Sequence, residues 1–172
     1  MSYIFRQSKH TRWHHIHEKL PWLDENEIPA DPLGDFVAGD NQISVYVIED
    51  DLSNLDRLIA AMAANRQNLA NYDYVLFSPE ILEQADITIK KTNGLLSDDE
   101  ANRWHLSLIN LSATKVIKLV TYIWLSPLTE TKRVLPNKLK DLIAQSVNSE
   151  FIPYDQVGKN IRPQIDSLVN RS

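Results

Sequence analysis

Between residues 43 and 77 the spacing of apolar positions changes twice. Ile43–Ile48 is a run of mostly β-branched and aromatic residues, which is typical of a buried strand. From Leu55 to Ala70 apolar residues recur three and four positions apart, which predicts a helix with one apolar face. Tyr74–Phe77 returns to strand character. This order predicts a β-α-β unit and therefore a partly parallel sheet.

The chain after residue 77 predicts one more strand and several helices. Ile87–Lys90 alternates apolar and polar residues, as expected of a third strand. Ser97–Glu100 has the form of a capping box, and apolar residues follow it, so we expect one long helix over 98–125. Helices are also expected after Pro136 and over 161–169. The prediction is an α/β or α+β fold with a small three- to four-stranded, partly parallel sheet, built on the β-α-β unit and covered by helices.

A chain of 172 residues has room for one domain and its core, so we expect a single domain over 1–172. Turn residues and acids outnumber apolar residues at 24–42, and residues 1–42 are therefore expected to form an N-terminal arm or irregular cap. Residues 43–91 are expected to form the β-α-β-rich core. Residues 97–172 are expected to form a helical part.

Composition excludes several classes of site. The chain has no cysteine, which excludes disulfides, thiolate metal sites and cysteine nucleophiles. It has only four glycines, too few and too scattered for a phosphate-binding loop. The most apolar stretch, Val116–Leu125, is far shorter than a membrane span, and no signal-peptide pattern opens the chain. We therefore expect a soluble, cytoplasmic protein that does not enter a membrane.

Charge is distributed unevenly along the chain. Residues 1–23 carry a net charge of +3, residues 24–100 a net of −13, and residues 101–172 a net of +5. Acidic and basic surfaces of this kind can pair within one chain or between two copies. The expected long helix is apolar on two faces, so its second face is covered either by the terminal helices or by the partner in a homodimer. A net charge of −5 disfavours nucleic acid as a partner.

Four of the five histidines fall within eight residues. If that stretch is helical, His10, His14 and His17 share one face, a spacing that can converge on a divalent transition metal such as zinc, nickel or copper. If it is extended, His15 and His17 share a face with Trp13 instead. The alternative to a metal site is a set of surface histidines beside Trp13.

The second candidate is the acidic strand end, Glu49, Asp50 and Asp51. Ligands of α/β folds commonly bind where a parallel strand ends. Acids here also complement the N-terminal dipole of the following helix, which gives them a structural role instead.

Two segments of the β-α-β region have a local likeness to a known family. Val47–Asp51 resembles the first strand and acidic pair of response-regulator receiver domains, and Tyr72–Ser78 resembles their phosphate-accepting strand. Ser78 stands where that family has its aspartate, and a strand and a helix are missing between the two segments. The chain is therefore not assigned to that family.

The absence of catalytic motifs, the uneven charge and the aromatic residues outside the expected core favour a non-enzymatic interaction or regulatory module with an unidentified protein partner. The alternative is a metal-dependent hydrolase or nuclease that uses the histidine cluster and the acidic strand end. The sequence decides neither whether the chain is an enzyme nor which partner it has.

Overall fold

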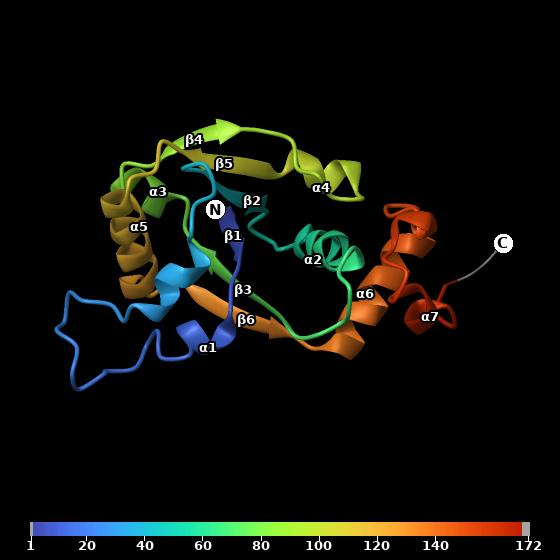
Figure 1. The fold of residues 1–172 in the computed structure, drawn as a ribbon, viewed down its shortest axis with the longest axis horizontal. Helices are drawn as coiled ribbons and strands as arrows, with labels where there is room; N and C mark the ends of the chain where they lie inside the picture. The colour runs from blue at the N-terminus through green and yellow to red at the C-terminus, as the bar shows by residue number, and fades with distance from the viewer. Residues whose placement is uncertain (1, 170–172) are drawn as a thin grey trace. The chain divides into compact units, whose positions relative to one another are not determined.

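The computed structural model describes residues 2–169, and in them six strands form one open sheet (Figure 1). The order across the sheet is β4-β5-β2-β1-β3-β6, and neighbouring strands are antiparallel throughout. The strands are β1 (Tyr3–Gln7), β2 (Ile43–Ile48), β3 (Tyr72–Phe77), β4 (Thr88–Lys91), β5 (His105–Ile109) and β6 (Glu130–Val134). The predicted three- to four-stranded, partly parallel sheet is therefore wrong.

Strand β1 explains why the sheet contains no parallel pair. The chain runs from β2 through a helix to β3 as predicted, and these two strands point in the same direction. They do not pair, because β1 lies between them and is antiparallel to both. In the register of β1 with β3, Phe5 lies opposite Leu76. The region predicted as an irregular cap thus supplies a central strand.

The described residues also form seven α-helices and two 3-10 helices. None of these helices combines the length and the apolar character that a membrane crossing requires. They are α1 (His10–Trp13), η1 (Asp31–Asp35), α2 (Leu55–Ala64), α3 (Glu80–Gln84), α4 (Asp99–Arg103), α5 (Ala113–Leu125), α6 (Pro136–Asn148), η2 (Tyr154–Gln156) and α7 (Arg162–Ile165).

The long helix expected over 98–125 is not present. Asp98 does cap a helix, α4, but this helix ends at Arg103 and the chain continues as β5. Asn110, with φ of 57°, ends the strand in the left-handed region, and Ser112 then caps α5 by accepting a hydrogen bond from the Lys115 N–H. Because the long helix that was expected to be apolar on two faces is not present, the homodimer loses this premise and stays an untested prediction.

The chain forms two compact units. The first takes the described residues up to Val47, with Asp73–Thr92 and His105–Lys132. The second takes Ile48–Tyr72, Asn93–Trp104 and the described residues from Arg133 onward.

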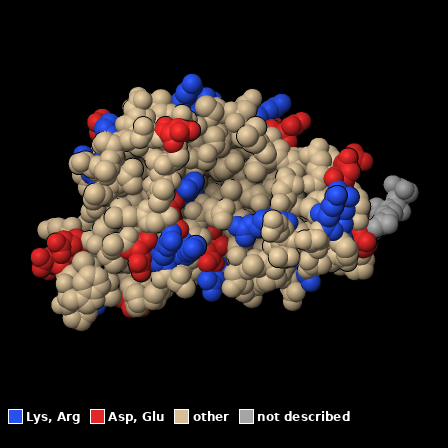
Figure 2. Space-filling model, viewed as in Figure 1, with Lys and Arg blue, Asp and Glu red and all other residues tan. Residues whose placement is uncertain are grey.

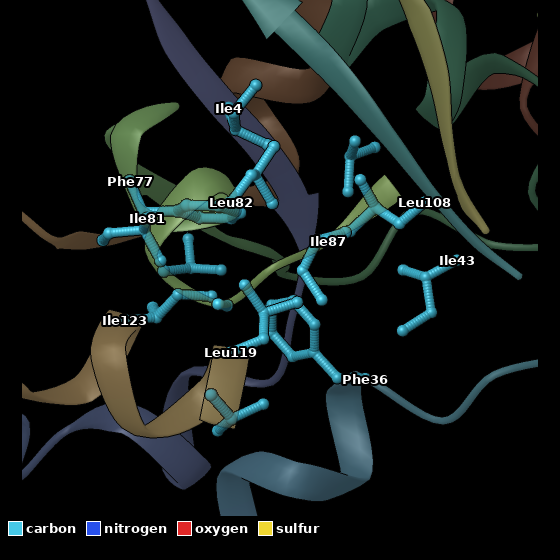
Figure 3. Packing of buried hydrophobic residues seen from close by; sticks show 14 of the residues in the cluster. Ile4, Phe36, Ile43, Phe77, Ile81, Leu82, Ile87, Leu108, Leu119 and Ile123 are labelled. Carbon is cyan, nitrogen blue, oxygen red and sulfur yellow. The ribbon is translucent and has the colours of Figure 1, made fainter. Parts of the chain in front are cut away.

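The core of the first unit lies between one face of the sheet and the helices α3 and α5 (Figure 3). Alternate strand residues point into it, which is the period of two expected of strands. Trp13 and Phe36 from the N-terminal region are fully buried in the same cluster, so this region packs as part of the unit. The strand and helix members include Ile4, Ile43, Val45, Val75, Phe77, Ile81, Leu82, Leu108, Leu119, Val120 and Ile123.

In the second unit α2 packs against α6. Leu58 and Ile59 of α2 and Leu142 and Ile143 of α6 are buried. Leu139, Leu142 and Ile143 form one apolar stripe on α6, whereas seven of the ten residues of α2 are buried, so α2 is apolar on more than one face.

Candidate functional site

The predicted metal-binding histidines lie where a short helix ends. Helix α1 covers only His10–Trp13, so the helical spacing that relates His10 to His14 and His17 is not continued. His14 follows the helix directly, and His17 lies in the turns after it. Within residues 2–169 no three His, Cys, Asp or Glu side chains are grouped in a way that could hold a metal ion. Metal binding therefore stays a prediction from the sequence.

The predicted ligand edge, Glu49, Asp50 and Asp51, follows the end of β2 and is exposed. Its hydrogen bonds shape the turn into α2. Asp51 Oδ1 accepts a hydrogen bond from the Ser53 N–H at 2.9 Å, and the Glu49 N–H donates to Asn54 Oδ1 at 3.0 Å. The hydrogen bonds from Ser53 lower the pKa of the Asp51 carboxyl. No structural feature of the described residues assigns a ligand to this edge.

One buried carboxylate, Asp35, fixes the N-terminal region to the first unit. Its Oδ2 accepts hydrogen bonds from the Trp13 Nε1–H at 2.8 Å and from the Lys9 N–H at 3.0 Å. Its Oδ1 forms an ion pair with Arg12 Nη1 at 2.6 Å. Arg6 donates to the Asp35 main-chain carbonyl at 3.1 Å. The loop between α1 and η1 therefore starts and ends at anchored positions.

That loop forms one wall of a groove. Main-chain hydrogen bonds close successive turns along it, from Ile16 to the Trp13 carbonyl, from Leu23 to the Leu20 carbonyl and from Glu27 to the Asp24 carbonyl. The end of α5 forms the other wall, and the space between them measures about 550 Å³. Apolar lining residues are Ile16, Leu20, Pro21, Leu23, Trp124, Leu125 and Pro127. We call this space the acidic groove because of the residues at its edge.

Acids predominate among the polar residues of the acidic groove. Glu18, Asp24, Glu25 and Glu27 line it, against Lys19 and His17. Figure 2 shows acidic side chains gathered on the loop between α1 and η1. Within that loop Trp22 is 70% exposed. The groove thus combines an apolar floor, an acidic edge and a nearby exposed aromatic side chain.

The sheet carries a second group of polar side chains on the face opposite the core. Because strand residues alternate between faces, Tyr46 of β2 and His105 and Ser107 of β5 point away from Val45 and Leu108. Tyr46 packs edge-on against the His105 ring, with centroids 5.1 Å apart. Just after β4, Thr92 Oγ1 lies 2.8 Å from His105 Nδ1 and 2.9 Å from Ser107 Oγ. We call Thr92, His105 and Ser107 the Thr92 cluster.

Burial changes the acid–base properties of this face. Tyr46, His105 and Ser107 are each 7% exposed. Burial lowers the pKa of His105 below its ordinary value, a hydrogen bond with the Thr92 main chain acts in the opposite direction, and the charge of Lys91 lowers it further. Burial raises the pKa of Tyr46, against the opposite effect of the Arg6 charge. At neutral pH both side chains are therefore uncharged.

Thr92 also lines a pocket of about 450 Å³, which we call the polar pocket. Its lining comes from residues 40–42 just before β2, from the end of β4, and from residues 109–112 at the end of β5 and in the turn to α5. Apart from Ile109 and Leu111, every lining residue has a polar or charged side chain: Asp40, Asn41, Gln42, Lys90, Thr92, Asn110 and Ser112.

Comparison with protein-family models, with curated protein sequences and with solved structures finds no match for this chain.

Neither the acidic groove nor the Thr92 cluster was predicted as a site. The groove had a partial signal, since the acids from residue 24 to residue 27 follow the apolar residues of 16–23 closely. The Thr92 cluster had none, because it depends on the pairing of β4 with β5.

Proposed function

We propose that this chain is an interaction module, and that its acidic groove binds a basic, amphipathic segment of a partner protein. The observation that carries the proposal is the pairing of an apolar floor with an edge of four acids. Both properties belong to one groove, whose walls are anchored through Trp13 and Asp35.

The apolar floor supplies affinity for apolar side chains. Leu23, Trp124 and Leu125 line the groove, and Leu125 is 44% exposed. Covering exposed apolar area contributes about 25 cal/mol per Å². A space of about 550 Å³ accommodates a few side chains and not a folded domain, so the expected ligand is a short segment with apolar anchors on one face.

The acidic edge supplies selectivity for basic segments. Glu18, Asp24, Glu25 and Glu27 give the groove a negative field in which lysine and arginine are favoured and acidic peptides are repelled. Glu18 Oε2 lies 2.5 Å from His15 Nδ1 and is therefore already paired with that side chain. We choose Asp24, Glu25 and Glu27 for mutation because they are exposed and close together in the chain, and Glu27→Gln keeps an oxygen to accept the hydrogen bond that the Asp24 N–H donates at 3.4 Å.

The test uses a synthetic helical peptide with leucine on one face and lysine on the other, followed by fluorescence anisotropy. We compare the wild type with the triple variant Asp24→Asn, Glu25→Gln, Glu27→Gln. Exposed charge pairs contribute about 0.2–1 kcal/mol each, so three of them predict roughly tenfold weaker binding. The difference should shrink at high salt.

A matched control removes three exposed acids elsewhere, with Glu80→Gln, Glu83→Gln and Asp99→Asn. It changes the net charge by the same amount and should leave binding within about twofold of the wild type. Equal weakening in both triple variants would show that net charge, and not the groove, attracts the peptide. Equal binding of a peptide with glutamate in place of lysine would contradict the proposal directly.

A further inference from the structure

The Thr92 cluster is independent of the acidic groove and has the geometry of an activated hydroxyl. Thr92 Oγ1 contacts both His105 Nδ1, at 2.8 Å, and Ser107 Oγ, at 2.9 Å. His105 and Ser107 are buried, whereas Thr92 is half-buried and lines the polar pocket. One hydroxyl therefore connects a buried imidazole with a space that a small molecule can enter.

More than one hydrogen-bond arrangement satisfies the cluster, because either tautomer of His105 can pair with Thr92 Oγ1 and either hydroxyl can donate between Thr92 and Ser107. A threonine hydroxyl donates one hydrogen bond and accepts up to two. With His105 neutral and its proton on Nε2, Thr92 donates to Nδ1 and the Ser107 hydroxyl donates to Thr92 Oγ1. Burial keeps the imidazole neutral at pH 7, as this arrangement requires. In this arrangement Thr92 Oγ1 donates its proton toward a base, His105 Nδ1, as an activated nucleophile does. The Ser107 hydroxyl stabilises the negative charge that develops on Thr92 Oγ1 as the proton leaves.

We propose that Thr92 is a nucleophile for acyl transfer from small polar esters, with His105 as its general base and the polar pocket as the substrate site. Thr92 Oγ bonds to the ester carbonyl carbon while its proton passes to His105 Nδ1. The tetrahedral intermediate expels the alcohol, which takes that proton and leaves the acyl group on Thr92. Water then attacks the acyl carbon, its proton passes through Nδ1 back to Thr92 Oγ, and the carboxylic acid leaves.

The pocket supplies donors for the oxyanion of this intermediate. Lys90 precedes Thr92 by two residues and lines the same pocket, as do Asn41 and Asn110, whose side chains carry amide N–H groups. A positive charge and amide N–H groups are the groups that stabilise an oxyanion in a site of restricted volume. Ser107 is not the nucleophile, because it is buried and its hydroxyl is hydrogen-bonded to Thr92.

The test uses p-nitrophenyl acetate as the probe. Wild-type protein should release p-nitrophenolate in a burst and gain one acetyl group, which tandem mass spectrometry of the digested protein places on Thr92. Thr92→Val removes the hydroxyl at constant shape and should abolish both signals. Thr92→Ser keeps the hydroxyl and should retain them. Thr88→Val, on the same face of β4, is the matched control.

The variant His105→Gln tests whether His105 acts as a general base or only as a structural partner of Thr92. Loss of a general base predicts a burst roughly 10²–10⁴-fold slower, and loss of the pH dependence that the imidazole gives to the wild type. A purely structural contact would leave the pH profile unchanged in shape. Acetylation confined to Lys90 or other amines, or a burst undiminished in Thr92→Val, overturns the proposal. Thermal melts of each variant confirm that the compared proteins are folded.

Discussion

Replacing Asp98 with alanine tests whether one buried carboxylate connects separate segments of the second unit. Asp98 and Arg57 form a bidentate ion pair, in which Asp98 Oδ2 lies 2.6 Å from Arg57 Nε and Asp98 Oδ1 lies 2.8 Å from Arg57 Nη2. The same Oδ1 accepts hydrogen bonds from the N–H groups of Glu100 and Ala101 at 2.9 and 3.1 Å and so caps α4. The Asp98 side chain is 1% exposed, so water cannot replace these contacts.

The expected loss in the free energy of unfolding follows from two contributions. Removing an N-cap costs about 1 kcal/mol. Breaking a fully buried ion pair costs about 3–5 kcal/mol. Here the Arg57 side chain is 25% exposed and its guanidinium lies 3.6 Å from the centroid of the Phe151 ring, so it keeps a partner and some water. We therefore take about 2 kcal/mol for the pair and expect a total near 3 kcal/mol.

Urea unfolding followed by far-UV circular dichroism measures this loss as a shift in midpoint at constant slope. Asp98→Asn keeps an oxygen for the cap and should lose about 2 kcal/mol, chiefly the charge pair. Asp99→Ala, an exposed neighbour, should change stability by less than about 0.5 kcal/mol. A double-mutant cycle with Arg57→Ala should show coupling of about 2 kcal/mol. A loss below about 1 kcal/mol in Asp98→Ala, or additive single variants, would refute the reasoning.

Three further predictions concern titration, metal and assembly. Because the pKa of His105 in the folded chain lies below the ordinary 6.5, unfolded chains bind the extra proton as the pH falls below that value. Stability should therefore decrease from about pH 6.5 downward, and less so in His105→Gln; equal slopes would contradict this. If His10, His14 and His17 bind zinc, nickel or copper, the metal should raise the melting temperature and His14→Ala with His17→Ala should remove the rise; no rise in wild type refutes it. A homodimer predicts twice the monomer mass in light scattering at micromolar concentration, and a monomer mass excludes it.

The segments that could be predicted from the sequence are those in which the apolar residues follow one period, either that of a strand or that of a helix. Ile43–Ile48 forms a strand with the bounds its sequence indicates, because four of its six residues are buried and β-branched or aromatic side chains fill both faces. Helix α2 begins where expected but ends at Ala64, since Asn65 and the polar residues after it no longer continue the apolar face. Segments that are strongly and evenly buried keep a clear apolar pattern and can therefore be predicted from the sequence.

The missed strands have physical reasons of their own. Strand β6, Glu130–Val134, has only exposed and half-buried residues and lies at the edge of the sheet, so it shows no apolar signal. Strand β5, His105–Ile109, follows a strong helix start at Asp98, and Leu108 also lies at helical spacing from Trp104 and Leu111. The long-helix prediction extended α4 across it. Strand β1 is five residues long and paired only with distant segments, which no local pattern reveals.

The prediction of a helix over 98–125 missed strand β5, and with it the Thr92 cluster. The sites predicted from the sequence, the histidines at 10–17 and the acids at 49–51, are groups of residues that are neighbours along the chain. Thr92 lies 13 positions from His105 and 15 from Ser107 along the chain, and only the pairing of Lys90 with Ser107 across β4 and β5 brings them together. In the predicted helix over 98–125, His105 and Ser107 would have pointed in different directions. In the strand they share a face, and this face carries the chemistry that the tests with p-nitrophenyl acetate address.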